Sequence, residues 1–286
     1  MDGEHLHGNF ANYYAFHPPQ DRLGCLAALR ALLRHNRDGP LLVADLGCNT
    51  GELTASLAEH LAASDDVAVE AVGIDIDGTL IARANAREAS AAHSVVVEYV
   101  AGDLSGDAPW RALRAWAAER RPAAPGFDLV CCFSTTMWIH LHGGDDGLAA
   151  FLHRAADLVA PCRGALLVEP QPWRCYRNAR KRQRRRGVSE DFPAMVRDGA
   201  IADKAPEAFI DRVLLAPPPS DCGSGASDGD GADGGGADGG AEYDADLTAH
   251  AGAGRFRSVR RFAKTTEGLF AKRVISVFHD LISVPP

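Results

Sequence analysis

Short apolar runs alternate with amphipathic stretches between residues 41 and 169 of this 286-residue chain. Residues 41–46 form a nearly unbroken apolar run bounded by turn residues, which is the pattern of a strand covered on both faces. The sequence predicts strands at 41–46, 67–74, 95–100, 127–133 and 165–169, and helices that begin at Glu52 and span 79–90, 110–120 and 146–160. This order of elements predicts an α/β fold with a doubly wound, mostly parallel sheet.

A different pattern follows this alternation. Residues 217–254 are dominated by glycine and aspartate, and an apolar run returns at 273–279. Because such a composition buries too little apolar surface to offset its ordering entropy, we expect a disordered acidic insertion at 217–254. The later run predicts a strand of a C-terminal antiparallel hairpin, which the insertion is expected to interrupt. One domain spanning 1–286 is sufficient, since no second periodic block of similar size follows the first.

Charge is distributed unevenly along the chain. The formal net charge of −8 equals that of the insertion, which carries eight acidic residues and no Lys or Arg, so the remainder is neutral. Residues 174–186 contain eight basic residues and no acid. Because eight like charges repel one another, this run favours an external anion, and RNA phosphate is the natural one. A nuclear-localisation signal is the alternative. The insertion is interpreted as a solvated segment rather than a nucleic-acid mimic that covers the run.

Several other classes of protein are disfavoured. No stretch approaches the roughly 20 apolar residues that span a bilayer, and the polar N-terminus lacks a signal core, so we expect a cytoplasmic protein with a nuclear pool as the alternative. The seven cysteines include no Cys-x-x-Cys pair, which favours reduced, buried thiols. The His and Cys residues show no ligand spacing, so neither a metal nor a membrane is expected, and the protein is expected to be a monomer.

Acidic residues end three successive predicted strands. Asp45 begins the loop Asp45-Leu-Gly-Cys-Asn-Thr-Gly51, Asp75 can accept hydrogen bonds from ribose hydroxyls, and Asp103 can accept the adenine amino proton. A nicotinamide enzyme is the alternative, but Asn49 stands where its middle glycine would be. The pattern resembles class I S-adenosylmethionine methyltransferases, which are Rossmann-like. The predicted cofactor-binding residues are Asp45, Gly47, Cys48, Asn49, Gly51, Asp75, Ile76, Asp103, Leu104 and Ser134.

Two acidic residues near these strand ends, Asp45 and Asp77, also allow plain structural roles. Asp45 could hold the glycine loop in shape, which is as good an interpretation as ligand contact. The neighbouring Asp77 is interpreted as the N-cap of the helix that follows it rather than as a ligand.

The motif Glu169-Pro-Gln-Pro-Trp173 narrows the range of candidate substrates. With the segments 8–14, 45–51, 73–77, 136–141, 144–148, 191–193 and 277–279, it makes the chain resemble the Bicoid-interacting family of RNA 5′-phosphate methyltransferases. Members that methylate a γ-phosphate carry Lys-Trp-Val-His where this chain has Met137-Trp-Ile-His140, and an arginine in place of His17. Phe16-His-Pro-Pro19 instead resembles the 5′-monophosphate branch, which acts on histidine tRNA and small-RNA precursors.

The resemblance implies a set of substrate contacts. It places phosphate donors in an N-terminal segment, 1–25, at Tyr13, His17 and Arg22, and a basic RNA-contacting segment at 174–186. His140 is a further candidate catalytic residue, interpreted as orienting substrate or as a satisfied structural histidine rather than as a general base. Arg177 is a further candidate, but the triphosphate enzymes have a lysine near positions 177 and 178 that this chain lacks, which leaves the third phosphate contact open. The implied RNA-binding residues are Asn9, Glu169, Trp173, Arg174, Arg177, Arg180, Lys181 and Arg182.

Two tryptophans are ambiguous. Trp173 either stacks on the terminal nucleotide or packs to hold a crossover loop in place. Trp138 is interpreted as packing beneath the site.

The chemistry supports the same reaction. A phosphomonoester has a second pKa of about 6, so its oxygen is already a nucleophile at neutral pH and needs no general base. Direct, in-line methyl transfer then depends on positioning. The alternatives are a triphosphate capping enzyme, a methyltransferase of another substrate class and a non-catalytic RNA-binding protein on a methyltransferase scaffold.

Overall fold

A computed structural model describes residues 7–8, 10–26, 29, 33, 39–63, 67–87, 94–161, 164–185, 187, 191–197, 199–202, 204–215, 256–263 and 274–281. Asn9, Arg186, Arg273 and the whole of 217–254 lie outside these residues. Predictions about Asn9 and the acidic insertion therefore remain sequence-based.

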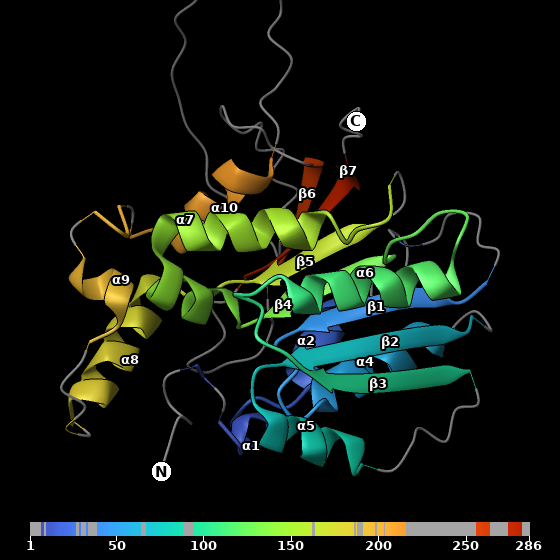
Figure 1. Cartoon of the computed structure of the whole chain (residues 1–286), viewed down its shortest axis with the longest axis horizontal. Helices are drawn as coiled ribbons and strands as arrows, with labels where there is room; N and C mark the ends of the chain where they lie inside the picture. Colours follow the sequence, from blue (N-terminus) through green and yellow to red (C-terminus); the bar gives the residue numbers. More distant parts are fainter. Residues whose placement is uncertain are drawn as a thin grey trace, which may run out of the picture.

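One seven-stranded sheet organises the described residues, in the order β3-β2-β1-β4-β5-β7-β6 (Figure 1). Its strands are β1 (Leu41–Leu46), β2 (Val69–Asp75), β3 (Val95–Ala101), β4 (Leu129–Phe133), β5 (Ala165–Glu169), β6 (Phe256–Ala263) and β7 (Val274–Leu281). β1 to β5 pair in parallel, whereas β7 is antiparallel to both β5 and β6. The predicted doubly wound sheet and its antiparallel C-terminal hairpin are confirmed.

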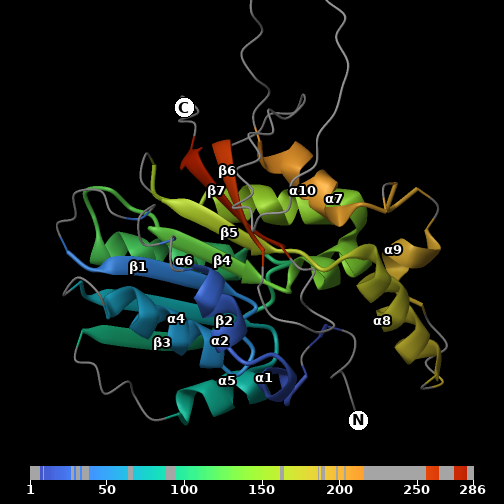
Figure 2. The same cartoon turned by 180° about the vertical axis from the view of Figure 1, so that it is seen from behind.

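Helices cover both faces of the sheet (Figures 1 and 2). Successive residues of β1 point to opposite faces, so Leu42 packs into the core beneath α6 and α7, while Val43 packs into the core beneath α4. Every residue of β1 is buried, as its apolar pattern predicts. The helices are α1 (Tyr13–Phe16), α2 (Gln20–Leu23), α4 (Glu52–Ala62), α5 (Gly78–Asn85), α6 (Ala108–Arg120), α7 (Thr136–Ala156), α8 (Trp173–Arg185), α9 (Pro193–Val196) and α10 (Pro206–Leu214), with a 3₁₀ turn at Gly24–Leu26.

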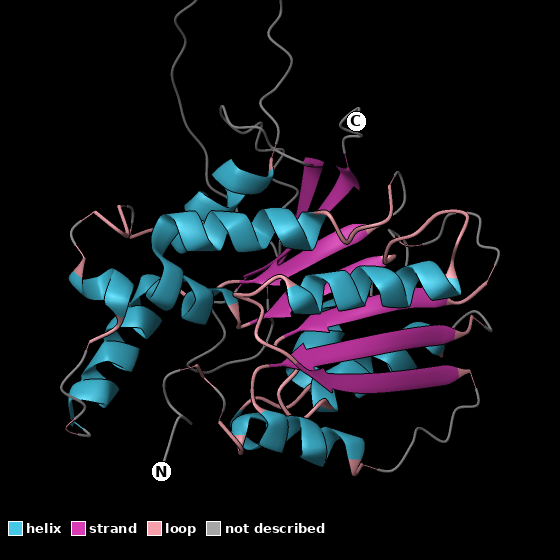
Figure 3. Ribbon diagram, in the orientation of Figure 1, coloured by secondary structure: helices cyan, strands magenta, loops and turns pink. Residues whose placement is uncertain are grey.

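Helix α7 begins ten residues before the predicted start at 146 (Figure 3). Its N-terminal part continues through Gly143 and then bends at Gly144, where φ is 69°. A Cβ at Gly144 would lie 2.6 Å from the carbonyl oxygen of Ala200, so only glycine fits this bend. The glycine pair and the acids after it make the sequence look like a helix start, which explains the wrong boundary.

The hairpin also differs from the prediction. Both of its strands follow the acidic insertion, so the insertion precedes the hairpin rather than interrupting it. Leu215 and Phe256, on either side of residues 216–255, form a parallel bridge, which places the two ends of that segment side by side. Strand β6 was missed because arginines occupy many of its positions, so it lacks an apolar run.

A third, smaller core lies under α8, apart from the two cores of the sheet. It is formed by Met137 and Leu141 of α7, Tyr176 and Ala179 of α8, and Phe192. The basic run therefore stands on a helix that is packed against the start of α7 (Figure 2). Among the described residues, no helix has both the length and the apolar character to cross a bilayer, and no group of three His, Cys, Asp or Glu could hold a metal.

Candidate active site

A cavity of about 1130 Å³ opens at the carboxyl ends of the parallel strands, as expected for a doubly wound sheet. The N-terminal segment, the start of α7 and one side of α8 form its remaining walls. The predicted residues that line it are Tyr13, His17, Asp45, Gly47, Asn49, Asp75, Ile76, Asp103, Leu104, Ser134, Arg174 and Arg182. The predicted residues that do not line it are Arg22, Cys48, Gly51, His140, Glu169, Trp173, Arg177, Arg180 and Lys181.

Asp75 lies at the end of β2 with both carboxylate oxygens engaged. Its Oδ2 accepts from the amide of Asn49 at 2.8 Å, and its Oδ1 accepts from the amide of Asp77 at 3.0 Å. Burial raises the pKa of this carboxyl. Asp75 lines the cavity and a carboxylate has about four acceptor sites, so it can still accept from a hydroxyl of a ribose.

Asp45 has the structural role that the sequence allowed, and it also lines the cavity. Its Oδ2 accepts from Thr54 Oγ1 of α4 at 2.6 Å, which holds the loop against the helix. Its Oδ1 is buried and has no hydrogen-bond partner, although the residue lines the cavity. Burial raises the pKa of Asp45 to about 6, and nearby Asp75 adds to the shift. A buried carboxylate with an unused oxygen fits a ligand that brings a positive charge.

The two glycines of the loop serve different purposes. Gly47 lines the cavity with φ of 90°, and a Cβ there would lie 2.3 Å from Thr135 Oγ1. Gly51 has φ of 74° and lies outside the cavity lining, where a Cβ would lie 2.4 Å from the ring of Tyr99. The structure therefore assigns Gly51 to packing rather than to ligand approach. The carbonyl of Cys48 faces Tyr14, whose hydroxyl donates to it at 3.1 Å.

The residues that follow β2 and β3 form a part of the cavity wall that suits a purine. Ile76 follows Asp75 and is 40% exposed, Leu104 forms part of the wall, and Asp103 lies beside it. The Asp103 carboxylate accepts from the amide of Ser105 at 2.9 Å, which fixes its orientation. An apolar wall, an acid beside it and the acid of β2 together fit the nucleoside of S-adenosylmethionine.

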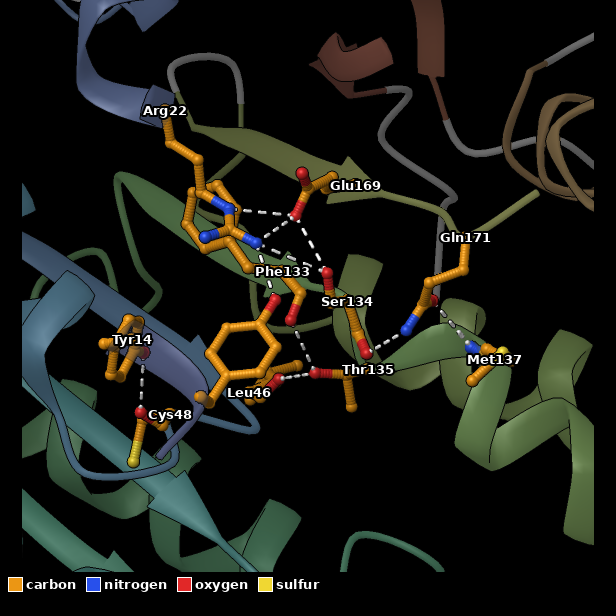
Figure 4. Close-up of polar contacts among 11 residues, drawn as sticks. Tyr14, Arg22, Leu46, Cys48, Phe133, Ser134, Thr135, Met137, Glu169 and Gln171 are labelled. Carbon is orange, nitrogen blue, oxygen red and sulfur yellow. Dashed lines mark hydrogen bonds and ion pairs between the residues drawn. The ribbon is translucent and has the colours of Figure 1, made fainter. Parts of the chain in front are cut away.

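A buried ion pair joins Arg22 of α2 to Glu169 at the end of β5 (Figure 4). Arg22 is 1% exposed, and its Nε and Nη2 donate to Glu169 Oε2 at 3.0 and 2.9 Å. Ser134 Oγ donates to the same oxygen at 3.0 Å. Burial alone would lower the pKa of Arg22, but Glu169 outweighs it and raises the pKa. Neither partner lines the cavity, because the two side chains bind each other, and the contacts of Arg22 with phosphate and of Glu169 with RNA stay predictions.

The ion pair instead positions Tyr13. Arg22 Nη2 donates to the Tyr13 hydroxyl oxygen at 2.7 Å, and the Tyr13 ring packs 4.7 Å from that of His17. Because the Tyr13 oxygen accepts from Arg22, its own hydrogen can be directed to another acceptor. Both Tyr13 and His17 are half-buried on the cavity wall, where the sequence predicts phosphate donors.

His140, a candidate catalytic residue, does not line the cavity. It is fully buried, with Nε2 2.7 Å from Asp145 Oδ1 and Nδ1 3.0 Å from the Tyr176 hydroxyl. Burial lowers its pKa, although Asp145 acts in the opposite direction. A neutral ring that donates from Nε2 and accepts at Nδ1 satisfies both contacts, so the arrangement supports a structural role rather than a catalytic one.

Helix α8 divides its basic residues between two roles. Arg174 and Arg182 line the cavity with Asn178 between them, whereas Arg177 and Lys181 are exposed outside it. Arg180 and Arg184 both pair with Asp191, the latter at 2.9 Å. Burial alone would raise the pKa of Asp191, but hydrogen bonds from the two arginines lower it. The expectation that the run lacks a counter-charge is therefore wrong for Arg180 and Arg184.

Several cavity residues were not predicted as ligands. Phe10 and Trp138 both line the cavity, with their ring centres 6.1 Å apart, so Trp138 forms part of the wall as well as packing. The Arg182 guanidinium lies 5.4 Å from the centre of the Phe10 ring. Trp173 stacks on Tyr176 at 4.9 Å outside the cavity, which supports its packing role.

Gln171 also reaches the cavity, where its amide donates to the carbonyl of Ser134 and accepts from the amide of Met137 at 3.3 Å. Its place inside Glu169-Pro-Gln-Pro-Trp173 was the available signal.

Comparison with known proteins gives a consistent result. A family model described as Bicoid-interacting protein 3 (Bin3) matches residues 127–198. The pre-miRNA 5′-monophosphate methyltransferase of Xenopus laevis is 41% identical over 199 residues, covering 65% of this chain and 74% of that protein. The Danio rerio protein of the same name is 36% identical over 214 residues, covering 70% and 81%. A solved structure of the plantazolicin methyltransferase BpumL with SAH is 12% identical, covers 60% of this chain and 55% of its own, and has a TM-score of 0.40.

Proposed function

We propose, because this chain belongs to the Bicoid-interacting protein 3 (Bin3) family, that it methylates the 5′-monophosphate of RNA with S-adenosylmethionine as methyl donor. The observation that carries the proposal is the position of Tyr13 and His17 on the wall of the same cavity as Asp45 and Asp75. One cavity thereby offers acids that suit a cationic nucleoside and donors that suit a phosphate.

Positioning of the phosphate against the methyl donor is sufficient for methyl transfer. The sulfonium of bound S-adenosylmethionine supplies an electrophilic methyl group. Tyr13 and His17 hold the terminal phosphate by hydrogen bonds, and its anionic oxygen attacks without a general base because its second pKa is about 6. Arg22 is paired with Glu169, so it orients Tyr13 without binding the reacting oxygen of the phosphate. The phosphate thus keeps its nucleophilicity while it is held in line.

Helix α8 provides the surface for the rest of the RNA. Arg174, Asn178 and Arg182 face the cavity and suit the first nucleotides, while Phe10 and Trp138 offer rings on which an unpaired base can stack. Arg177 and Lys181 lie outside and suit the phosphates of an adjoining stem. Small-RNA precursors and histidine tRNA are the candidate substrates, since both present a 5′-monophosphate beside a stem.

The proposal is tested by methyl transfer from labelled S-adenosylmethionine to one RNA stem prepared with three 5′ ends. We expect label on the 5′-monophosphate and none on the 5′-hydroxyl. Label on the 5′-triphosphate alone would place the protein with the capping enzymes. An absence of label on every RNA, with cofactor binding intact, would reject an RNA end as the acceptor.

Cofactor affinity should depend on pH through Asp45. Its pKa is about 6 in the free protein, and a cationic ligand favours the charged form, so binding below pH 6 requires loss of a proton. We expect affinity for S-adenosylmethionine to fall by up to about tenfold per pH unit between pH 6 and pH 5. Titration calorimetry at several pH values measures this, and Asp45→Asn should bind weakly at all of them. An equal pH slope in that variant would assign the effect to another group.

The exposed basic residues of α8 should determine the salt dependence of RNA binding. Each phosphate contact contributes roughly 0.7–0.9 to the slope of log affinity against log salt concentration. The double variant Arg177→Ala, Lys181→Ala is expected to reduce that slope by about 1.5. Arg180→Ala is the matched control, because this arginine pairs with Asp191 and its removal should change the slope less. Equal slopes for wild type and the double variant would mean that these residues do not contact RNA.

A further inference from the structure

Asn49 occupies an unusual backbone position. It stands in the loop after β1 where a nucleotide-binding motif would have its middle glycine, and its φ is 54°. Among the described residues, only Asn49 and Ser134 have positive φ without being glycine. A glycine would adopt this conformation at lower cost, so the asparagine side chain is expected to have a task that glycine cannot perform.

The side chain of Asn49 joins the loop to the N-terminal segment. Its Oδ1 accepts from the amide of Thr50 at 2.8 Å, and since an amide N–H needs an oxygen acceptor, this contact fixes the orientation of the side-chain amide. Nδ2 then donates to the carbonyl of Phe10 at 3.3 Å. A second link lies nearby, where the Tyr14 hydroxyl donates to the carbonyl of Cys48 at 3.1 Å (Figure 4).

The backbone of Asn49 faces the cofactor side of the cavity. Its amide donates to Asp75 Oδ2 at 2.8 Å, and Asp75 is the acid that suits the ribose. One residue therefore contacts both the nucleoside-binding carboxylate and the segment that carries Tyr13. The ring of Phe10 in turn packs near Trp138 and under Arg182 on the RNA side.

We propose that Asn49, with Tyr14, is a positioning residue that couples cofactor binding to RNA binding. A nucleoside on Asp75 holds the Asn49 amide in place, and Asn49 and Tyr14 then hold the N-terminal segment where Tyr13 meets the phosphate. This inference rests on the proposed function and adds to it. Coupling is reciprocal, so each ligand should raise the affinity of the other by the same factor, about fivefold or more.

The test measures binding rather than turnover. Fluorescence anisotropy of a 5′-monophosphate RNA stem gives the RNA affinity with and without saturating S-adenosylhomocysteine. For wild type we expect about fivefold or greater tightening, and an equal gain in S-adenosylhomocysteine affinity when RNA is present.

Asn49→Gly keeps the positive φ and removes the side-chain link, so its coupling factor should fall below about twofold, whatever the change in its affinity for each ligand alone. Asn85→Gly is the matched control. Its side chain donates to the Tyr99 carbonyl outside the cavity, so its coupling should equal that of wild type.

Tyr14→Phe gives an independent check if Asn49→Gly does not fold, since it removes one hydroxyl and should weaken the coupling. The inference is overturned if wild type shows no coupling, or if the variants that fold keep the wild-type coupling factor. The proposed function stands in that case, provided that wild type binds 5′-monophosphate RNA more tightly than 5′-hydroxyl RNA. If wild type binds both RNAs equally, the proposed function and the inference are both rejected.

Discussion

Replacing Glu169 with glutamine is expected to lower the free energy of unfolding by about 3–5 kcal/mol, because the Arg22 charge stays buried without its counter-charge. Arg22 and Glu169 are 1% and 0% exposed, so solvent cannot replace the lost partner. Chemical denaturation at neutral pH, with the slope of the transition compared between proteins, measures the loss. The same variant should lose methyl transfer, since Tyr13 would no longer be held by a fixed arginine.

A double variant separates stability from function. Arg22→Met with Glu169→Leu removes both charges, and replacing a buried ion pair by apolar groups is often neutral for stability. We expect this protein to regain much of the lost stability while it remains poorly active. A loss below about 1 kcal/mol in Glu169→Gln would contradict the buried ion pair, because that is the size typical of exposed pairs.

The second large effect is expected at Tyr13. Tyr13→Phe removes the donor that faces the phosphate, and loss of one such donor typically lowers kcat about 100-fold or more. Affinity for S-adenosylhomocysteine should change little, because this hydroxyl is not among the groups assigned to the nucleoside. Steady-state transfer to a 5′-monophosphate stem measures the effect.

Tyr176→Phe is the matched control for Tyr13→Phe. It removes a tyrosine hydroxyl that contacts His140 outside the cavity. We expect kcat/KM per folded molecule to match wild type in this variant. Equal kcat/KM in Tyr13→Phe and wild type would remove Tyr13 from the reaction.

The sheet could be predicted from the sequence because parallel strands are buried on both faces. The runs at 41–46 and 165–169 match β1 and β5 at both ends. Asp77 is confirmed as an N-cap, accepting from the Thr79 amide at 2.8 Å. Elements whose positions depend on packing between distant segments were harder. Helix α8 has few apolar residues and is fixed by contacts of Tyr176 and Ala179 with α7, which no local pattern reveals.

The site was predictable where topology fixes it and not where charges pair across the chain. Acids at the ends of β1 and β2 meet in the cavity because parallel strands end at one edge of the sheet. Arg22 and Glu169 are 147 residues apart, and a sequence cannot show that each satisfies the other. Arg22 was therefore assigned to phosphate and Glu169 to RNA, as the family resemblance implied. The packing of Gly51 was hidden for a similar reason, since the Tyr99 ring that it meets comes from another strand.

The central claim is that the methyl group is transferred to the terminal phosphate of RNA. Phosphorus NMR of a 5′-monophosphate RNA before and after reaction with S-adenosylmethionine tests it directly. An unmodified terminal phosphate titrates with a pKa of about 6, whereas a methylated one has lost that proton site. We predict a terminal resonance whose shift no longer changes between pH 5 and pH 8. Incorporation of methyl label with a terminal phosphate that still titrates near pH 6 would show that the methyl lies elsewhere on the RNA.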